Sequence, residues 1–153
     1  MDIYNVTFFG HRNFCIERKT EERLYAIIRD LILTKPYVDF FVGRNGDFDI
    51  FAASVVKRAQ NAFGHDNSSL TLVLPYAQKD IEYYAQYYDN VMIPECIEKT
   101  HPKGAITKRN RWMAEACDLF ICYVERESGG AYEAMKYAER IGKNIIDLAY
   151  EAE

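Results

Sequence analysis

The chain has 153 residues, the size of one ordinary domain with its own core. Hydrophobic residues make up 49% and charged residues 27%, a composition that excludes a fibre or a disordered tail. The formal net charge of -4 disfavours broad binding to nucleic acid, so nucleic acid is not an expected partner.

The opening stretch, MDIYNVTFFGHRNF, lacks a basic segment followed by an apolar one, and no run approaches the roughly 20 apolar residues of a membrane span. We therefore expect a cytoplasmic protein that does not contact a membrane. The four cysteines and three histidines have no metal-ligand spacing. Neither a metal nor a cofactor is predicted.

In chain order, short apolar runs alternate with stretches of helical period, which is typical of βαβ units around a parallel sheet. The predicted strands are 3–9, 39–42, 70–74, 119–124 and 144–148, and the predicted helices are about 17–33, 47–63, 106–116 and 130–141. The predicted fold is a three-layer Rossmann-like α/β sandwich with a central, mainly parallel five-stranded sheet. Residues 1–153 form one domain in this interpretation.

One segment, about 76–103, interrupts the alternation. It holds an amphipathic piece, AQKDIEYYAQYYDN, in which four tyrosines cannot all face one way on a helix. Packing by an extra helix explains the segment. The alternative is a lid that offers an aromatic ring for a base to stack on, because long insertions in compact domains are often functional.

Glycine stands beside polar residues at the predicted strand ends, where open α/β sheets bind ligands. The first strand leads into Gly10, His11 and Arg12. The second leads into a loop with Gly43, Asn45 and Gly46, followed by Asp47 and Asp49 at a helix start. Asp47 suits a helix cap. Asp49 and Asn45 suit hydrogen bonds from sugar hydroxyls, because acids at that position would repel a phosphate.

The fourth predicted strand leads into Ser128, Gly129 and Gly130 before a helix. Backbone amides at a helix start are unpaired donors, and glycines let a ligand approach them, so this turn suits an anion. A tight strand-to-helix turn explains the same residues. Glu133, in the first helical turn, is either an ordinary helix-start acid or a carboxylate aimed at the ligand.

The third predicted helix carries AITKRNRWM, in which Asn110 falls on the apolar stripe with Ile106 and Met113. A polar amide there needs partners, and Arg109 lies one step around the helix. Arg12 supplies a guanidinium suited to phosphate. His11 suits a hydrogen-bond donor or an acid near neutral pH. A solvated surface explains Arg12 and His11 equally well, and it explains Arg109 and Asn110 less well because Asn110 points inward.

Taken in order, FFGHRNF, VGRNGDFD, AITKRNRWM and SGGAYEAMKYA resemble the SLOG superfamily, the Rossmann-like group named for the Smf/DprA and LOG proteins. The resemblance spans nearly the whole chain and is strongest to the small stand-alone bacterial branch. It implies a nucleotide or nucleotide-derived ligand at the strand ends, and a homodimer. The residues that we predict to bind the ligand are Gly10, His11, Arg12, Gly43, Asn45, Gly46, Asp49, Arg109, Asn110, Gly129 and Gly130.

The LOG enzymes of this group, which cleave a nucleotide to free base and ribose phosphate, imply an alternative. Their pattern has an arginine-lysine pair four residues before a methionine, then P-G-G-x-G-T and a glutamate. Arg109 and Met113 match, but Asn110 replaces the lysine, no proline precedes Gly129, and Lys136 replaces the glutamate.

A weaker resemblance is to nucleoside 2-deoxyribosyltransferases, whose turn D-x-G-T-x-x-E carries a nucleophilic glutamate. Gly130 and Glu133 match that turn, and the aspartate is missing. Under either resemblance, the alternative function is an N-glycosidase with Glu133 as its catalytic residue.

Overall fold

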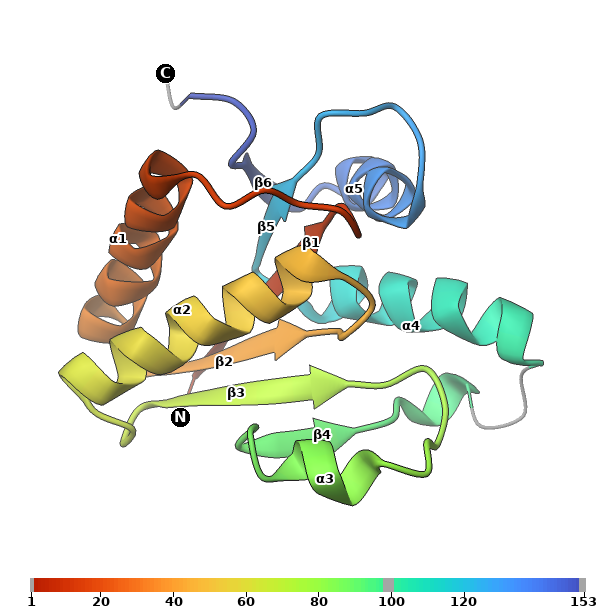
Figure 1. Cartoon of the computed structure of the whole chain (residues 1–153), viewed down its shortest axis with the longest axis horizontal. Helices are drawn as coiled ribbons and strands as arrows, with labels where there is room; N and C mark the ends of the chain where they lie inside the picture. Colours follow the sequence, from red (N-terminus) through yellow and green to blue (C-terminus); the bar gives the residue numbers. More distant parts are fainter. Residues whose placement is uncertain (1, 98–100, 152–153) are drawn as a thin grey trace.

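The computed structural model describes residues 2–97 and 101–151 (Figure 1). The elements in chain order are β1 (Ile3–Gly10), α1 (Arg18–Thr34), β2 (Tyr37–Val42), α2 (Asp47–Phe63), β3 (Ser68–Val73), α3 (Ile81–Ala85), β4 (Asn90–Met92), the 3-10 helix η1 (Glu95–Ile97), α4 (Pro102–Ala116), β5 (Leu119–Tyr123), α5 (Gly130–Arg140) and β6 (Asn144–Asp147). The α/β alternation predicted from the sequence is confirmed.

The central sheet has six strands in the order β4-β3-β2-β1-β5-β6, and every neighbouring pair is parallel. The prediction of five strands is therefore wrong by one. The missed strand, β4, has three residues and pairs with β3 through Thr71↔Asn90, Leu72↔Val91 and Val73↔Met92. A strand this short shows no hydrophobic pattern of its own, and the structure places it inside the predicted insertion.

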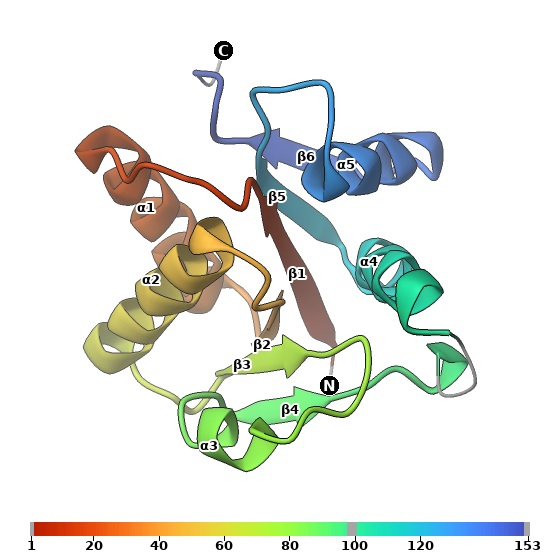
Figure 2. The same ribbon diagram turned by 45° about the vertical axis from the view of Figure 1, so that its right-hand side comes forward.

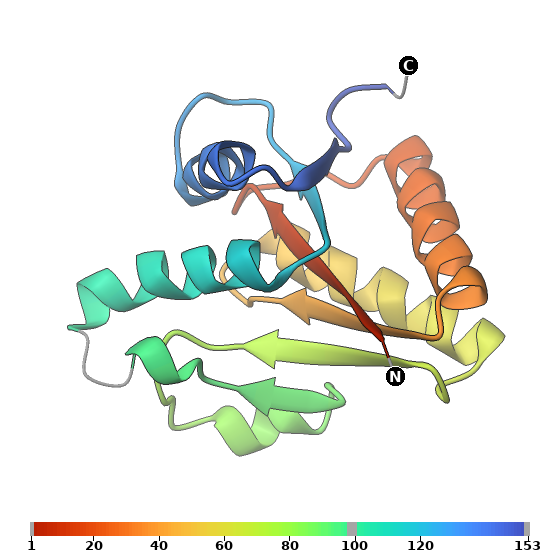
Figure 3. The same cartoon turned by 180° about the vertical axis from the view of Figure 1, so that it is seen from behind.

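The sheet lies between two helical layers (Figure 2). Helices α1 and α2 cover one face, where Phe8 of β1 packs with Phe40 of β2 at a ring-centroid distance of 6.0 Å. Helices α4 and α5 cover the other face (Figure 3), where Phe9 stacks on Phe120 of β5 at 5.1 Å. Because side chains alternate along a strand, β1 contributes to both cores.

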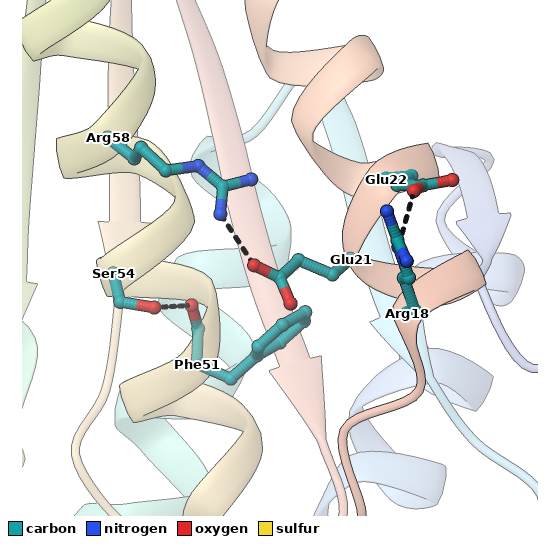
Figure 4. Close-up of polar contacts among 6 residues, drawn as sticks. All are labelled: Arg18, Glu21, Glu22, Phe51, Ser54 and Arg58. Atoms are coloured by element: carbon teal, nitrogen blue, oxygen red, sulfur yellow. Dashed lines mark hydrogen bonds and ion pairs between the residues drawn. The ribbon is translucent and has the colours of Figure 1, made fainter.

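Polar contacts on the outside of the α1 and α2 layer add little to its apolar packing (Figure 4). Arg58 of α2 pairs with Glu21 of α1 at 2.5 Å, and Arg18 pairs with Glu22 within α1 at 3.1 Å. Exposed pairs of this kind contribute about 0–1 kcal/mol each. The layer is held mainly by fully buried side chains such as Leu24 and Ile28 of α1 and Val56 of α2.

The segment predicted as an insertion folds as α3, β4 and η1 along the β3 edge of the sheet, and its residues 98–100 lie outside the described part. The amphipathic piece forms only the five-residue helix α3 before the chain turns into β4. Helix α4 begins at Pro102, four residues before the predicted start. Proline suits the first helical position, and the His101 side chain accepts a hydrogen bond from the Lys103 N–H, so HPKG starts the helix.

Candidate functional site

A cavity of about 370 Å³ opens at the carboxyl ends of β1, β2 and β5. The strand order reverses between β1 and β5, and this switch point is the usual ligand site of an open α/β sheet. The lining residues are Phe8, Phe9, Gly10, His11, Arg12, Gly43, Asn45, Gly46, Asp49, Ile106, Arg109, Asn110, Arg126, Ser128, Gly129, Gly130 and Ala131. All eleven residues assigned to the ligand from the sequence line it.

The loops after β1 and β2 interlock at one side of the cavity. The Asp47 N–H donates to the Arg12 carbonyl at 2.8 Å, and Arg12 Nε donates to the Asn45 carbonyl at 3.1 Å. A Cβ at Gly46 would lie 2.4 Å from Arg12 Cα, and one at Gly10 would lie 2.1 Å from Phe48 Cγ. Glycine is needed at both positions because backbone and ring pass too close for a side chain.

The predicted cap at Asp47 is not present. Gly46 is the N-cap of α2, and Asp47 Oδ2 instead accepts a hydrogen bond from the Phe14 N–H at 3.4 Å. This contact ties the α2 start to the chain that follows β1.

Asp49 and Arg109 carry opposite charges, and both lie close to Gly43 without forming a direct ion pair. A Cβ at Gly43 would lie 3.1 Å from Arg109 Nη1 and 3.2 Å from Asp49 Oδ2, so Gly43 leaves room for both groups. Asp49 Oδ2 accepts a hydrogen bond from the Asn45 N–H at 3.0 Å. Burial raises the pKa of Asp49 to about 6, although the Asn45 hydrogen bond and the Arg109 charge act to lower it.

Arg109 is only 2% exposed, and it uses two of its donors within the protein. Its Nη1 donates to the Val73 carbonyl at 2.9 Å and its Nε to Asn110 Oδ1 at 2.8 Å. The Asn110 amide thus finds the partner that its place on the helix required. Burial lowers the pKa of Arg109, and the nearby Asp49 opposes this. Arg109 is a fixed cation in the cavity wall.

His11 is placed differently from its predicted role as a donor or acid. It is 7% exposed, and its Nε2 accepts hydrogen bonds from the Glu125 N–H at 2.8 Å and the Arg126 N–H at 3.3 Å. Burial, followed by the Arg126 charge, lowers the pKa of His11 below its usual value. At neutral pH the neutral ring therefore holds the loop between β5 and α5.

The start of α5 forms the opposite side of the cavity. Gly129 is its N-cap with φ +95°, a conformation that favours glycine. A Cβ at Gly130 would meet only Asn110 Nδ2, at 3.9 Å, so space is open above the helix start. The first amides of the helix, with the exposed guanidinium group of Arg126 in the loop before them, make this side positive. It suits an anion.

Glu133, the predicted catalytic residue, does not line the cavity, and its side chain is exposed. Ala131 and Ala134 of α5 face the core, and this turns Glu133 outward. The carboxylate that does line the cavity is Asp49.

Sequence reasoning missed five lining residues: Phe8, Phe9, Ile106, Arg126 and Ala131. Arg126 carried a detectable signal, because it is a cation close to the glycine turn after a predicted strand. Ile106 was expected to be buried and is 38% exposed at the cavity. Ile106 is exposed because α4 begins earlier than predicted and its N-terminal part extends past the sheet.

The tyrosines of the predicted lid lie outside the cavity lining. Tyr83 is 59% exposed and packs edge-on against Tyr84 and Tyr87. Arg44, in the β2–α2 loop, stacks over the Tyr84 ring at 3.9 Å and donates to the Tyr88 hydroxyl at 3.4 Å. The segment therefore contacts and stabilises the β2–α2 loop, which contributes residues to the cavity.

Two further expectations concern metals and membranes. Among residues 2–97 and 101–151, no group of three or more His, Cys, Asp or Glu side chains is placed to hold a metal ion. Within the same ranges, no helix has the length and apolar character required to cross a membrane.

The architecture and the cavity at the switch point define a Rossmann-like α/β fold. The structure is similar to DNA processing protein A (DprA) from Streptococcus pneumoniae, with TM-score 0.65 and 16% identity over 94% of this chain and 49% of that chain. It is also similar to DprA from Helicobacter pylori, with TM-score 0.64 and 16% identity over 93% of this chain and 63% of that chain. The chain thus spans about half to two thirds of these DprA chains.

No protein-family model matches the sequence, and no curated protein is significantly similar to it. At 16% identity the structural similarity shows a shared fold.

The expectation that nucleic acid is not a partner is wrong, because the Helicobacter pylori protein, which has this fold, binds single-stranded DNA. The expectation rested on net charge, which sums over the whole surface. The cavity has a local positive charge of its own, because its lining residues include Arg12, Arg109 and Arg126 and one carboxylate, Asp49.

Proposed function

We propose that this protein binds a nucleotide or nucleotide-derived ligand in the cavity at the strand ends. The observation that carries the proposal is the division of the cavity into two sides. The open helix start at Gly129 and Gly130, with Arg126 in the loop before it, suits a phosphate. Asp49, on the other side, suits hydrogen bonds from sugar hydroxyls.

The broader assignments of the sequence also remain proposals. They are a single SLOG-like domain over 1–153, membership of the small stand-alone branch, a homodimer and a cytoplasmic location. The N-glycosidase alternative has no support from the position of Glu133, which lies away from the cavity.

Single-stranded DNA is a second candidate ligand. The fold shared with Helicobacter pylori DprA favours it, as does the exposed ring of Tyr87, whose centroid lies 5.2 Å from Lys57 Nζ. Both candidates carry phosphates, so one panel of compounds compares them.

The experiment is a thermal-shift panel of AMP, ADP, ADP-ribose, cyclic AMP and a single-stranded oligonucleotide. A ligand of the folded state raises Tm increasingly with its concentration. Mononucleotides that stabilise the protein support the main proposal. Stabilisation by the oligonucleotide alone, weakening steeply with salt, supports the second candidate. No shift with any compound rejects both.

Gly130→Ala tests where the phosphate lies. The new methyl group fits the free protein, so Tm without ligand stays unchanged, but it occupies the space over the first amides of α5. We expect affinity for the best compound of the panel to fall at least ~10-fold, equivalent to ~1.4 kcal/mol. Glu133→Gln, in the same helix but outside the cavity, is the matched control with unchanged affinity. Equal affinity for Gly130→Ala and the parent would place the phosphate elsewhere.

A further inference from the structure

The loop between β5 and α5 supplies three cavity residues, Arg126, Ser128 and Gly129. Two amides of this loop, those of Glu125 and Arg126, donate to His11 Nε2 at 2.8 and 3.3 Å. A backbone N–H can only donate, so Nε2 presents its lone pair and the neutral ring carries its proton on Nδ1. The loop on the positive side of the cavity is therefore held to the end of β1 by a neutral imidazole, whose Nε2 carries no proton.

We infer that His11 is a positioning residue whose neutral imidazole holds the β5–α5 loop in its ligand-binding shape, and that protonation of His11 releases the loop. Protonation would put an N–H on Nε2 opposite two other N–H groups, and both hydrogen bonds would be lost. The ring is 7% exposed, so the new charge would have little contact with water. The effect on ligand affinity rests on the proposed function, while the effect on the loop does not.

The charged groups around His11 set the pH at which His11 is protonated and the loop is released. Burial is the largest cause and lowers the pKa of His11, and the charge of Arg126 in the loop lowers it further. Glu125 in the loop and Asp147 at the end of β6 act to raise this pKa, but the net shift is a lowering. Tyr123 at the end of β5 stays neutral, because its hydrogen bond to Glu125 and burial raise its pKa to about 12. The loop is therefore held at neutral pH and is released below the ordinary pKa of histidine.

The sign of the pH effect separates this mechanism from simple electrostatics. A new positive charge on His11, or loss of the negative charge on Asp49, would strengthen the binding of an anion as the pH falls. Release of the loop removes Arg126 and the Gly129 turn from the ligand and weakens binding. We expect weaker binding at acid pH.

Two variants of His11 isolate the role of the ring. In His11→Gln the side-chain oxygen can accept from the same two amides, and it does not titrate between pH 5 and 8. His11→Ala removes the acceptor. The first variant keeps the loop in place at every pH, and the second releases it at every pH.

The loop is measured without ligand, by NMR exchange protection of the Glu125 and Arg126 amides, with the amides of β3 as reference and the His11 ring resonances reporting its titration. We expect parental protection to fall at least ~10-fold on protonation of His11. Protection in His11→Gln stays high and in His11→Ala stays low. Equal protection in His11→Ala and the parent, or protection that does not follow the His11 titration, overturns the inference.

Binding of ADP is then measured from pH 7.5 to 5.5, with Asp49→Asn as a background that removes the other titrating group of the cavity. In that background, affinity is expected to fall with pH, and addition of His11→Gln leaves only the smaller fall that protonation of the ADP phosphate causes. An equal fall with and without His11→Gln overturns the inferred effect on binding. Affinity that rises as His11 is protonated overturns the inferred effect on binding. If ADP does not bind at any pH, the proposed ligand is at fault, and the exchange measurement alone decides the role of His11.

Discussion

Asp49 illustrates how the cavity imposes a free-energy cost on a single residue. A carboxylate in water ionises readily at neutral pH. Asp49 is half-buried and accepts one backbone hydrogen bond, from the Asn45 N–H. Among the described residues, no direct ion pair within 4 Å is found for it. Its pKa is raised to about 6, so the folded protein binds this proton more tightly than the unfolded chain does. Ionised Asp49 therefore destabilises the fold at neutral pH.

Asp49→Asn should consequently stabilise the protein at pH 8. The raised pKa of about 6 implies a gain of at most ~3 kcal/mol in the free energy of unfolding. The gain shrinks as the pH falls through 6 and is small at pH 4, and it vanishes only below the usual aspartate pKa, where Asp49 is neutral in both states. Urea unfolding at pH 8 and pH 4 measures it.

The control for this prediction is Asp47→Asn, two residues earlier, where the side chain is exposed. It should change stability by less than ~1 kcal/mol, the usual size of a helix-start charge effect. If Asp49→Asn were less stable than the parent at pH 8, the carboxylate would have a stabilising partner other than the Asn45 N–H.

At the scale of elements, the cavity depends on the close packing of the loop after β1 against the start of α2. Gly46→Ala should separate the two, because its Cβ would lie 2.4 Å from Arg12 Cα and 3.0 Å from the Arg12 carbonyl oxygen. The Asp47 N–H bond to that oxygen would be lost as well. We expect a loss of about 2–4 kcal/mol in urea unfolding, from overpacking and one hydrogen bond.

Gly130→Ala is the matched control, since its methyl group meets no atom closer than 3.9 Å. Gly46 has φ −176°, an extended backbone that alanine adopts freely, so strain does not explain a loss. If Gly46→Ala were as stable as Gly130→Ala, the two loops would not be in the contact described.

The sequence was informative wherever an element has a long pattern. Strands β1, β2, β3, β5 and β6 were predictable because each is a continuous apolar run covered by helices. Strand β4, with three residues at the sheet edge, has no such run. The start of α4 was missed because Pro102 resembles a break until its place at the first helical position is known.

The site was predictable for a similar reason, because parallel strands bring all their carboxyl ends to one edge of the sheet. What the sequence did not specify is which atoms face which. Whether His11 donates or accepts depends on the distant amides of Glu125 and Arg126, and whether Glu133 reaches the cavity depends on the rotation of α5. Both are set by tertiary packing and not by local pattern.

At the scale of the whole molecule, the two cores share one sheet. Strand β1 sends Val6 and Phe8 into the core under α1 and α2, and Phe9 into the core under α4 and α5. If either helical layer detached from the sheet, it would expose strands that also form the core under the other layer. This arrangement predicts that the chain unfolds as one cooperative domain.

Trp112, the only tryptophan, makes this testable. It packs edge-on against Phe41 at 5.4 Å in the α4 layer, so its fluorescence reports that layer. Far-UV circular dichroism has its largest helical contribution from α1 and α2, at 17 residues each. The two signals should give the same urea midpoint and the same m-value, about 1–3 kcal/mol/M. A fluorescence midpoint distinctly below that of circular dichroism would mean that the α4 and α5 layer unfolds first, and the single-domain prediction would then fail.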